Sequence, residues 1–495
     1  MDKGDTRAYF LGILVCLGGF MFGYDTGVVG GAITLHSYRE SFRYLGYNKS
    51  QTTQVSSLAV GLQQCGSFVG CFGIFPIASR WGRKPSMILS ALVFVIGAAI
   101  QTADTHHLSS FYVGRIIAGL GVGGASVLVP LYSAEMSPKK IRGRIGSGYQ
   151  FLFTWGIFVS YWANYAVDKH VDQNTARQWQ IPISLQIIPG ALLGIGMFFV
   201  PESARWLVQK DRHDDAWKSL TWIRAHSGPE VQGELDEIRA TVVAEREASR
   251  GSLKVELKQK VTIYRMLLSF TVMTCQVCTG ANAMAYFSPQ FFTLVVGQGT
   301  ENLLISGIFG AIKIVSCGIF IVFLAERIGR RVALCGGAIL MSASLLCIAV
   351  VLKLKPPPGN GEVTAPGVAL VALIYFAIIV YNMSWGPLGW IYIAEVLSPR
   401  TRDLGVAIAL GTQWIFNIIW SVATPYMINN IGWGTFLFFA AFDAFSAVFS
   451  FYFVKETMGK SLEEMENEFH SQAAQTRLPV SEDKGQDECE HVEKN

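Results

Sequence analysis

A short basic junction occurs twice in this chain, roughly 250 residues apart. The first copy spans residues 73–84 (GIFPIASRWGRK), the second spans residues 323–331 (FLAERIGRR), and each lies between two long apolar runs. Similarity at a fixed offset indicates an internal duplication, and in membrane proteins a duplication produces two related halves. The sequence therefore predicts two homologous membrane domains.

The composition agrees with a chain that lies mostly in lipid. Hydrophobic residues make up 51% of the 495 residues, and charged residues make up only 15%. Soluble domains typically carry about 25% charged residues, so this chain is too apolar for a soluble protein of its size. The net charge of +4 is small and the basic residues gather at the ends of apolar runs, so no nucleic-acid partner is expected.

Twelve apolar runs approach or exceed the roughly 20 residues that a helix needs to cross the bilayer. The predicted fold class is therefore an all-α membrane protein, with twelve transmembrane helices in two pseudo-symmetric six-helix bundles. The runs lie at residues 9–32, 54–78, 85–102, 109–133, 146–167 and 181–200, and at residues 263–293, 303–325, 332–352, 367–394, 404–428 and 433–454.

These runs divide the chain into four regions. Short junctions on one side carry most of the basic residues, which marks that side as cytoplasmic and places both termini there. The membrane is expected to be the plasma membrane. The regions are an N-terminal transmembrane domain at 1–200, a cytoplasmic helical linker at 201–262, a C-terminal transmembrane domain at 263–454, and a mostly disordered cytoplasmic tail at 455–495.

Two motifs that bind dinucleotides or metals in other proteins are interpreted here as helix-packing features. Residues 119–124 satisfy GxGxxG, but they lie inside an apolar run with no preceding strand, so close helix packing is preferred to dinucleotide binding. Cys275 and Cys278 form a CxxC within an apolar run, where helix packing is preferred to metal or redox use. No catalytic constellation is evident, so the chain is interpreted as a non-enzyme with no metal and no cofactor.

Asp25 and Arg115 are ionisable residues inside predicted spans, where burial is costly and function is the first hypothesis. If the two side chains pair, protonation of Asp25 would release Arg115 and create a two-state element that a proton gradient could bias. The alternative is a static ion pair that only holds two helices together.

Lys313 and Asp443 are two further charges inside predicted spans. Lys313 has no acidic partner within its own run, so it either reaches a polar cavity or snorkels, or it presents its charge to an anionic substrate. For Asp443 the sequence suggests only a helix-packing contact.

Uncharged polar side chains in the spans could bind a polyol, which needs several donors and acceptors together with an aromatic face. Gln413 and Asn417 are one helical turn apart and share a face. For any single residue, a hydrogen bond between helices is as good an interpretation as substrate contact. The candidates are Gln150, Gln276, Asn282, Trp390, Gln413 and Asn417.

Over residues 9–470 the chain resembles the sugar porter family of the major facilitator superfamily. The resemblance depends on several motifs together. They are GRIIAGLGVGG at 114–124, PLYSAEMSP at 130–138 followed by Arg142-Gly143, PESARWL at 201–207, GANAMAYFSPQFF at 280–292, SWGPLGW at 384–390, AEVLSP at 394–399, and KETMGKSLEEM at 455–465.

The resemblance implies two six-helix domains that rock about a central site, and it assigns roles to individual residues. Asp25 and Arg115 match the proton pair of symporters in the family. Tyr286 and Phe287 match positions beside the outer gate, and Tyr286 is also counted among the expected substrate-binding residues. Sugar-contacting positions are matched by Gln150, Gln276, Asn282, Trp390 and Asn417.

The same resemblance implies a cytoplasmic gating network that favours one or the other conformational state. Its members would be Arg80, Arg83, Glu135, Arg142 and Glu202 in the first half, and Glu326, Arg327, Arg330, Glu395, Arg402 and Glu456 in the second.

Three departures from the family pattern point to one branch. Val277 replaces the second of two paired glutamines, Ser79 replaces the acid of the first junction, and Ala204 replaces a proline. The loss of the acid at Ser79 should weaken closure of the inner gate in the first half. With the segments GIFGAIK and RQWQIPISLQIIPG, these departures resemble the quinate permease branch more than typical glucose carriers.

The sequence thus predicts a secondary active transporter that imports a monosaccharide or a carboxylated sugar-like polyol (hexose, pentose, quinate or galacturonate type) with a proton. The proton is the coupling ion, the partners are a small-molecule substrate and the bilayer, and the protein is expected to be monomeric. The alternatives are a facilitative uniporter, which would take up no proton with its substrate, and a nutrient sensor that binds without transport.

Overall fold

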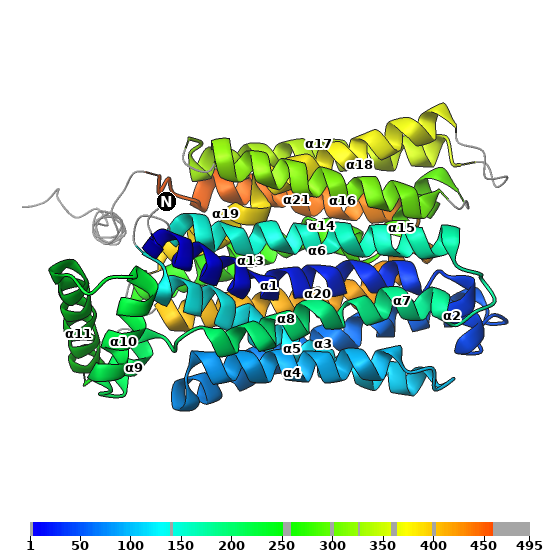
Figure 1. Ribbon diagram of the computed structural model, residues 1–495. Coiled ribbons are helices and arrows are strands. Elements are labelled where there is room, and N and C mark those ends of the chain that lie inside the picture. The colour runs from blue at the N-terminus through cyan, green and yellow to red at the C-terminus, as the bar shows by residue number, and fades with distance from the viewer. Residues whose placement is uncertain are drawn as a thin grey trace, which may run out of the picture.

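The computed structural model describes residues 3–138, 142–250, 259–297, 301–324, 327–357, 364–397 and 402–458, and these are helical almost throughout. Most of the helices run roughly parallel in one elongated bundle (Figure 1). The predicted all-α class is confirmed. The predicted tail beyond residue 458 lies outside the described residues.

Six helical rods form the first half of the bundle. A short helix, α2 (His36–Ser41), covers one end of this half, here called the α2 end (Figure 1). Asn48 caps the next helix, because its side-chain oxygen accepts from the Gln51 amide at 3.0 Å. The rods are α1 (Lys3–Ala32), α3 (Lys49–Trp81), α4 (Arg83–Thr102), α5 (Leu108–Met136), α6 (Arg142–His170), and the run of α7 (Arg177–Leu185), α8 (Ile187–Gly196) and η1 (Met197–Phe199).

Six more rods form the second half, and two of them are broken near their middle. Gly280 has a φ of +78° between α13 and α14, a conformation that favours glycine. The rods are α13 (Lys260–Cys278) with α14 (Ala281–Tyr286) and α15 (Ser288–Val296), α16 (Asn302–Ile319) with η2 (Phe320–Leu324), α17 (Arg330–Leu354), α18 (Ala365–Met383) with α19 (Trp385–Val396), α20 (Arg402–Asn430), and α21 (Gly434–Phe453).

Eleven of these rods are long and apolar enough to cross a membrane. The twelfth is α6, which has 29 residues and therefore the length to span about 30 Å at 1.5 Å per residue. It packs between α1 of its own half and α16 of the other half. The predicted count of twelve spans is consistent with this arrangement.

The linker helices extend beyond the other end of the bundle, here called the linker end (Figure 1). They attach to the first half: Arg7 donates to the Trp222 carbonyl at 2.7 Å, and Arg224 donates to the Met136 carbonyl at 3.2 Å. Arg224 also pairs with Glu234 at 2.5 Å, which joins two of the linker helices. These helices are α9 (Ala204–Gln209), α10 (His213–Arg224) and α11 (Pro229–Arg250).

The two halves bond to one another at the α2 end. Tyr161 on α6 donates to the Ala285 carbonyl at 2.6 Å, and Ser57 on α3 donates to the Val422 carbonyl at 3.1 Å. Lys49 reaches the Asn429 carbonyl at 3.3 Å. These three hydrogen bonds hold the two halves together at the α2 end in this conformation.

Candidate functional site

Asp25 and Arg115 form an ion pair inside the first half. Arg115 Nη1 on α5 lies 2.5 Å from Asp25 Oδ1 on α1, and the side chains are 1% and 0% exposed. Arg115 Nε also donates to the Ala59 carbonyl at 2.8 Å, and its Nη2 donates to Gln63 Oε1. The second carboxylate oxygen of Asp25 has no hydrogen-bond partner among the described residues. Arg115 therefore has neutral partners that can hold it if Asp25 takes a proton.

Two glutamines that were not predicted lie beside this ion pair. Gln63 accepts from Arg115, and Gln101 Oε1 lies 3.5 Å from Arg115 Nη1. Both glutamines are fully buried within apolar helices. A buried amide in a lipid-embedded helix needs a partner, so this feature could have marked them.

The side-chain amide of Gln276 donates hydrogen bonds to the protein backbone. Its Nε2 donates to the carbonyls of Trp385 at 3.0 Å and Gly386 at 2.9 Å, at the start of α19. This contact bridges α13 to the first turn of α19, directly after the break between α18 and α19. Of the Gln276 amide, only the oxygen remains for a substrate hydroxyl.

Asn282 and Asn417 meet between α14 and α20. Asn282 Nδ2 donates to Asn417 Oδ1 at 3.3 Å, and Asn417 Nδ2 is buried without a partner among the described residues. Trp414, one turn earlier on α20, also has an indole N–H that is buried without a partner. Two unsatisfied donors on one helix face can serve a polyol oxygen. Trp414 was not predicted, and its position beside Gln413 and Asn417 was the available signal.

The other predicted substrate residues lie on α6, α14, α19 and α20. Gln150 on α6 and Trp390 on α19 are half-buried, and Trp390 packs against apolar side chains of both halves. Gln413 is 9% exposed. Tyr286 is buried where α14 approaches α1 so closely that a Cβ atom on Gly30 would lie 2.0 Å from the Tyr286 carbonyl oxygen.

Lys313 is buried at the seam between the halves, where α16 of the second half packs against α6 of the first. Gly307 and Gly310 precede it on the same face of α16, and Cβ atoms there would lie 3.2 Å from Trp162 and 2.9 Å from Phe158 of α6. The Lys313 ammonium lies 6.0 Å from the centre of the Phe153 ring and 5.7 Å from that of Phe309. It forms no ion pair with a described residue, and its side chain is 2% exposed.

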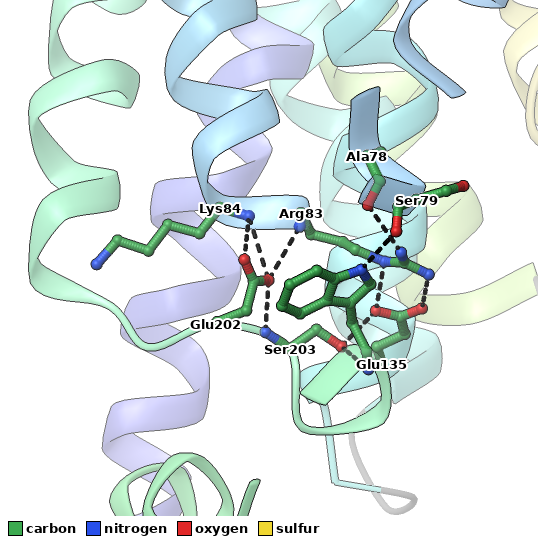
Figure 2. A network of polar contacts seen from close by, with 8 residues as sticks. Ala78, Ser79, Arg83, Lys84, Glu135, Glu202 and Ser203 are labelled. Atoms are coloured by element: carbon green, nitrogen blue, oxygen red, sulfur yellow. Dashed lines mark hydrogen bonds and ion pairs between the residues drawn. The ribbon is translucent and has the colours of Figure 1, made fainter. Parts of the chain in front are cut away.

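A polar network closes the linker end of the first half (Figure 2). Arg83 donates two hydrogen bonds to the Glu135 carboxylate, from Nε at 3.1 Å and from Nη2 at 3.0 Å. The Ser203 hydroxyl donates to the same carboxylate at 2.5 Å. Glu202 accepts from the backbone amides of Arg83 at 3.0 Å and Lys84 at 3.1 Å, and so caps the N-terminus of α4.

Burial raises the pKa of Glu202 above its usual value, and the three backbone amides that donate to it offset part of that rise. Gly82 is required beside this carboxylate. Its φ is +107°, and a Cβ atom there would lie 2.2 Å from Glu202 Oε2.

The second half repeats the network with different residues. Arg330 Nη2 donates to Glu395 at 3.2 Å, and the Thr457 hydroxyl donates to Glu395 at 2.5 Å. Glu456 accepts from the backbone amides of Arg330 at 2.8 Å and Arg331 at 3.2 Å. Each network therefore ties together helices at the linker end of its own half.

The remaining predicted gating residues are not part of these networks as described. Arg80 and Arg327 are exposed, and neither forms an ion pair with a described residue. Arg142 and Arg402 begin helices, but their side chains lie outside what the structure describes, and so does Glu326.

No three His, Cys, Asp or Glu side chains of the described ranges lie close enough together to bind a metal ion. Cys275 and Cys278 are both free and buried.

Known proteins resemble the chain over nearly its whole length. The probable quinate permease of Neosartorya fischeri is 34% identical over 477 residues, which cover 94% of this chain and 88% of that protein. The quinate permease of Emericella nidulans is 33% identical over 475 residues, with the same two coverages.

Solved structures give the same fold. The proton:xylose symporter XylE bound to 6-bromo-6-deoxy-D-glucose matches with a TM-score of 0.78 at 25% identity, covering 94% of this chain and 100% of that chain. The inward-open conformation of XylE from E. coli matches with a TM-score of 0.76 at 25% identity, covering 93% and 99%.

The family model described as sugar (and other) transporter matches residues 11–469. This match spans both halves, the linker and the beginning of the tail. The chain is therefore a multi-pass membrane transporter and not an enzyme, and it belongs to the sugar porter family of the major facilitator superfamily.

Proposed function

We propose that this transporter imports a carboxylated, sugar-like polyol of the quinate type together with a proton, by alternating access. The observation that carries the proposal is the buried ammonium of Lys313, which lies at the seam of the halves without an acidic partner among the described residues. An unpaired charge at this depth is costly, and a substrate carboxylate would offset that cost. The relatives named as quinate permeases support an anionic substrate.

Neutral hydroxyls of the polyol have their own partners in this scheme. The unsatisfied N–H groups of Trp414 and Asn417 donate to ring hydroxyls, and the oxygen of Gln276 accepts from one. Trp390 supplies an aromatic face for the C–H surface of the ring. Gln150, Asn282, Tyr286 and Gln413 complete the proposed site.

The proton binds Asp25. When Asp25 is ionised, its pair with Arg115 ties α1 to α5, and protonation removes the charge that holds them. The Ala59 carbonyl and Gln63 then continue to accept hydrogen bonds from Arg115 while α1 moves. The proton is the only coupling species in this proposal, and no cofactor takes part.

The linker end faces the cytoplasm, and the membrane is the plasma membrane. Most basic junction residues lie at this end, which supports the orientation. The networks of Arg83 and Arg330 rearrange as the halves rock, so that one gate closes while the other opens. The transporter acts as a monomer, with the central site formed between its own halves.

Uptake of radiolabelled quinate, galacturonate, glucose and xylose in transport-null cells tests this function. We expect quinate to accumulate, and a protonophore to abolish the accumulation. An anion with one proton crosses without net charge, so uptake should produce no current, whereas a neutral sugar with one proton would produce an inward current. Accumulation of glucose or xylose with current, and none of quinate, would overturn the assignment of substrate.

A second candidate is symport of a neutral monosaccharide. It is favoured by the match to XylE with a bound hexose analogue, and by the two rings of Phe153 and Phe309, which already give Lys313 a cation–π environment. The uniporter and sensor alternatives give different outcomes in the same assay. A uniporter would equilibrate substrate without responding to the protonophore, and a sensor would bind substrate without uptake.

A further inference from the structure

Asp443 is a buried carboxyl group that no part of the proposed cycle uses. It lies on α21 inside the second half and is 0% exposed. Neither of its oxygens has a hydrogen-bond partner among the described protein atoms. Asp25 is also 0% exposed, but it is paired with an arginine, whereas no hydrogen-bond partner of Asp443 lies among the described protein atoms.

A small cavity adjoins Asp443. Its volume is about 10 Å³, which is room for roughly one water molecule. Two of its lining side chains other than Asp443 carry hydroxyl groups, those of Thr279 and Tyr381. The lining residues are Thr279, Ala281, Met284, Met341, Leu345, Ala377, Ile378, Tyr381 and Asp443.

No cation among the described residues balances this carboxyl. From α13 the titratable neighbours are the thiols of Cys275 and Cys278, and from α18 the neighbour is the phenol of Tyr381. The residues that α14 and α17 bring to the cavity do not titrate; they are Ala281, Met284, Met341 and Leu345. No Lys, Arg or His of the described ranges forms an ion pair with Asp443.

An isolated carboxylate in such surroundings is far more costly than a neutral carboxylic acid. The neutral acid keeps one O–H group, which can donate to a water molecule in the cavity or to the Tyr381 hydroxyl. The surroundings of Asp443 therefore fit a bound proton better than a bound metal ion, because a metal ion needs several more oxygen ligands.

The same cavity touches the break between α13 and α14. Thr279 lines it, and three residues to either side lie Gln276 and Asn282, which belong to the proposed substrate site. Phe439, one turn before Asp443 on α21, packs onto this break, since a Cβ atom on Gly280 would lie 2.7 Å from its ring. Asp443 thus adjoins, through the cavity and Phe439, the segment that carries Gln276 and Asn282.

We propose that Asp443 is a second proton-binding site, separate from Asp25, and that its proton holds the α13–α14 break in the geometry seen here. The proton comes from solvent and returns to solvent. Loss of the proton would place a charge against the break and loosen it. This proton site is independent of which substrate is carried.

Infrared spectroscopy of the purified full-length transporter in lipid nanodiscs tests the bound proton. A protonated carboxylic acid gives a carbonyl-stretch band that a carboxylate lacks. We expect such a band at neutral pH, its loss in Asp443→Asn, its retention at a shifted frequency in Asp443→Glu, and its persistence in Asp25→Asn. A spectrum in which Asp443→Asn removes no carboxylic-acid band would overturn the proposal.

Hydrogen exchange of the peptide 276–287 tests the link to the break, after correction for the intrinsic effect of pH on exchange. Asp443→Asn is a neutral mimic of the protonated acid, so wild type and variant should exchange alike at mildly acidic pH. At alkaline pH the wild type should lose protection while the variant keeps it. Equal behaviour of the two proteins across the whole range, or divergence already at acidic pH, would remove the link.

Neither measurement involves transport. A failure of the Asp443 proposal is therefore distinguishable from a failure of the quinate assignment or of coupling through Asp25.

Discussion

Asp25 Oδ1 and Arg115 Nη1 lie 2.5 Å apart, and solvent reaches almost nothing of either side chain. A buried ion pair contributes little net stability by itself, because the loss of hydration offsets the attraction. In the proposed cycle Asp25 takes a proton while Arg115 keeps its hydrogen bonds to neutral partners, the Ala59 carbonyl and Gln63.

In Asp25→Asn, substrate should still cross the membrane but should no longer accumulate against its gradient. The amide keeps the shape of the protonated acid, so exchange of labelled substrate across the membrane should continue, while uptake should stop at equilibrium and become independent of the protonophore. The matched control is Asp236→Asn on the exposed face of α11, which should accumulate substrate normally. Accumulation against a gradient by Asp25→Asn would exclude coupling through this pair.

Replacing Lys313 by methionine should change substrate choice rather than folding. A charge-assisted hydrogen bond contributes about 2 kcal/mol, so the ratio of quinate to glucose uptake should fall roughly 30-fold. The control is Lys353→Met, which removes an exposed lysine that lies 4.5 Å from the Trp433 ring. An unchanged ratio in Lys313→Met would show that the ammonium does not contact the substrate.

Much of the fold could be predicted because its determinants are local. Each apolar run is long enough to be recognised alone, and basic junctions mark the ends of the runs. Arg83 and Arg330 lie in the two copies of the duplicated junction. Their ion pairs with Glu135 and Glu395 have the same form. A repeated motif in related halves is repeated in space as well.

The partners of the polar side chains could not be predicted, because they lie far away in the sequence. Gln276 on α13 bonds to the carbonyls of residues 385 and 386 in the first turn of α19, which lie more than 100 residues later in the sequence. Likewise, Gln63 reaches Arg115 from a different helix. Such contacts depend on the crossing of helices, which hydropathy and spacing do not determine.

The two linker-end networks should differ in stability. Arg83 and Glu135 are 9% and 5% exposed and share two bonds, whereas Arg330 and Glu395 are 12% and 29% exposed and share one. Breaking the more deeply buried pair leaves an uncompensated charge at a cost of about 3 kcal/mol. Breaking the more exposed pair should cost about 1 kcal/mol.

Scanning fluorimetry of the purified variants checks this difference. Glu135→Gln should lower the Tm more than Glu395→Gln does. Asp215→Asn, which removes the acid of an exposed pair with Arg212, should leave the Tm unchanged. Equal losses from the two glutamate variants would show that burial does not distinguish the networks.

Glu202 should make stability depend on pH in a defined direction. Because burial raises its pKa in the folded protein, the folded state holds the proton more tightly than the unfolded chain does. The stabilisation is complete below the usual glutamate pKa and is lost as pH rises through the raised value. The Tm of wild type relative to Glu202→Gln should therefore be highest at acidic pH and should fall across this window. A difference that rises with pH would contradict the shift.

The seal at the α2 end should weaken when Tyr161 loses its hydroxyl. The Tyr161 hydroxyl donates to the Ala285 carbonyl at 2.6 Å, and this bond joins α6 of one half to α14 of the other. A buried hydrogen bond contributes about 1 kcal/mol, so Tyr161→Phe should shift the population roughly fivefold toward states that open at this end. Hydrogen exchange in the peptides 49–57 and 285–292 should rise accordingly. Tyr47→Phe, at an exposed tyrosine of the same end, should leave it unchanged, and unchanged exchange in Tyr161→Phe would mean that this bond does not hold the halves together.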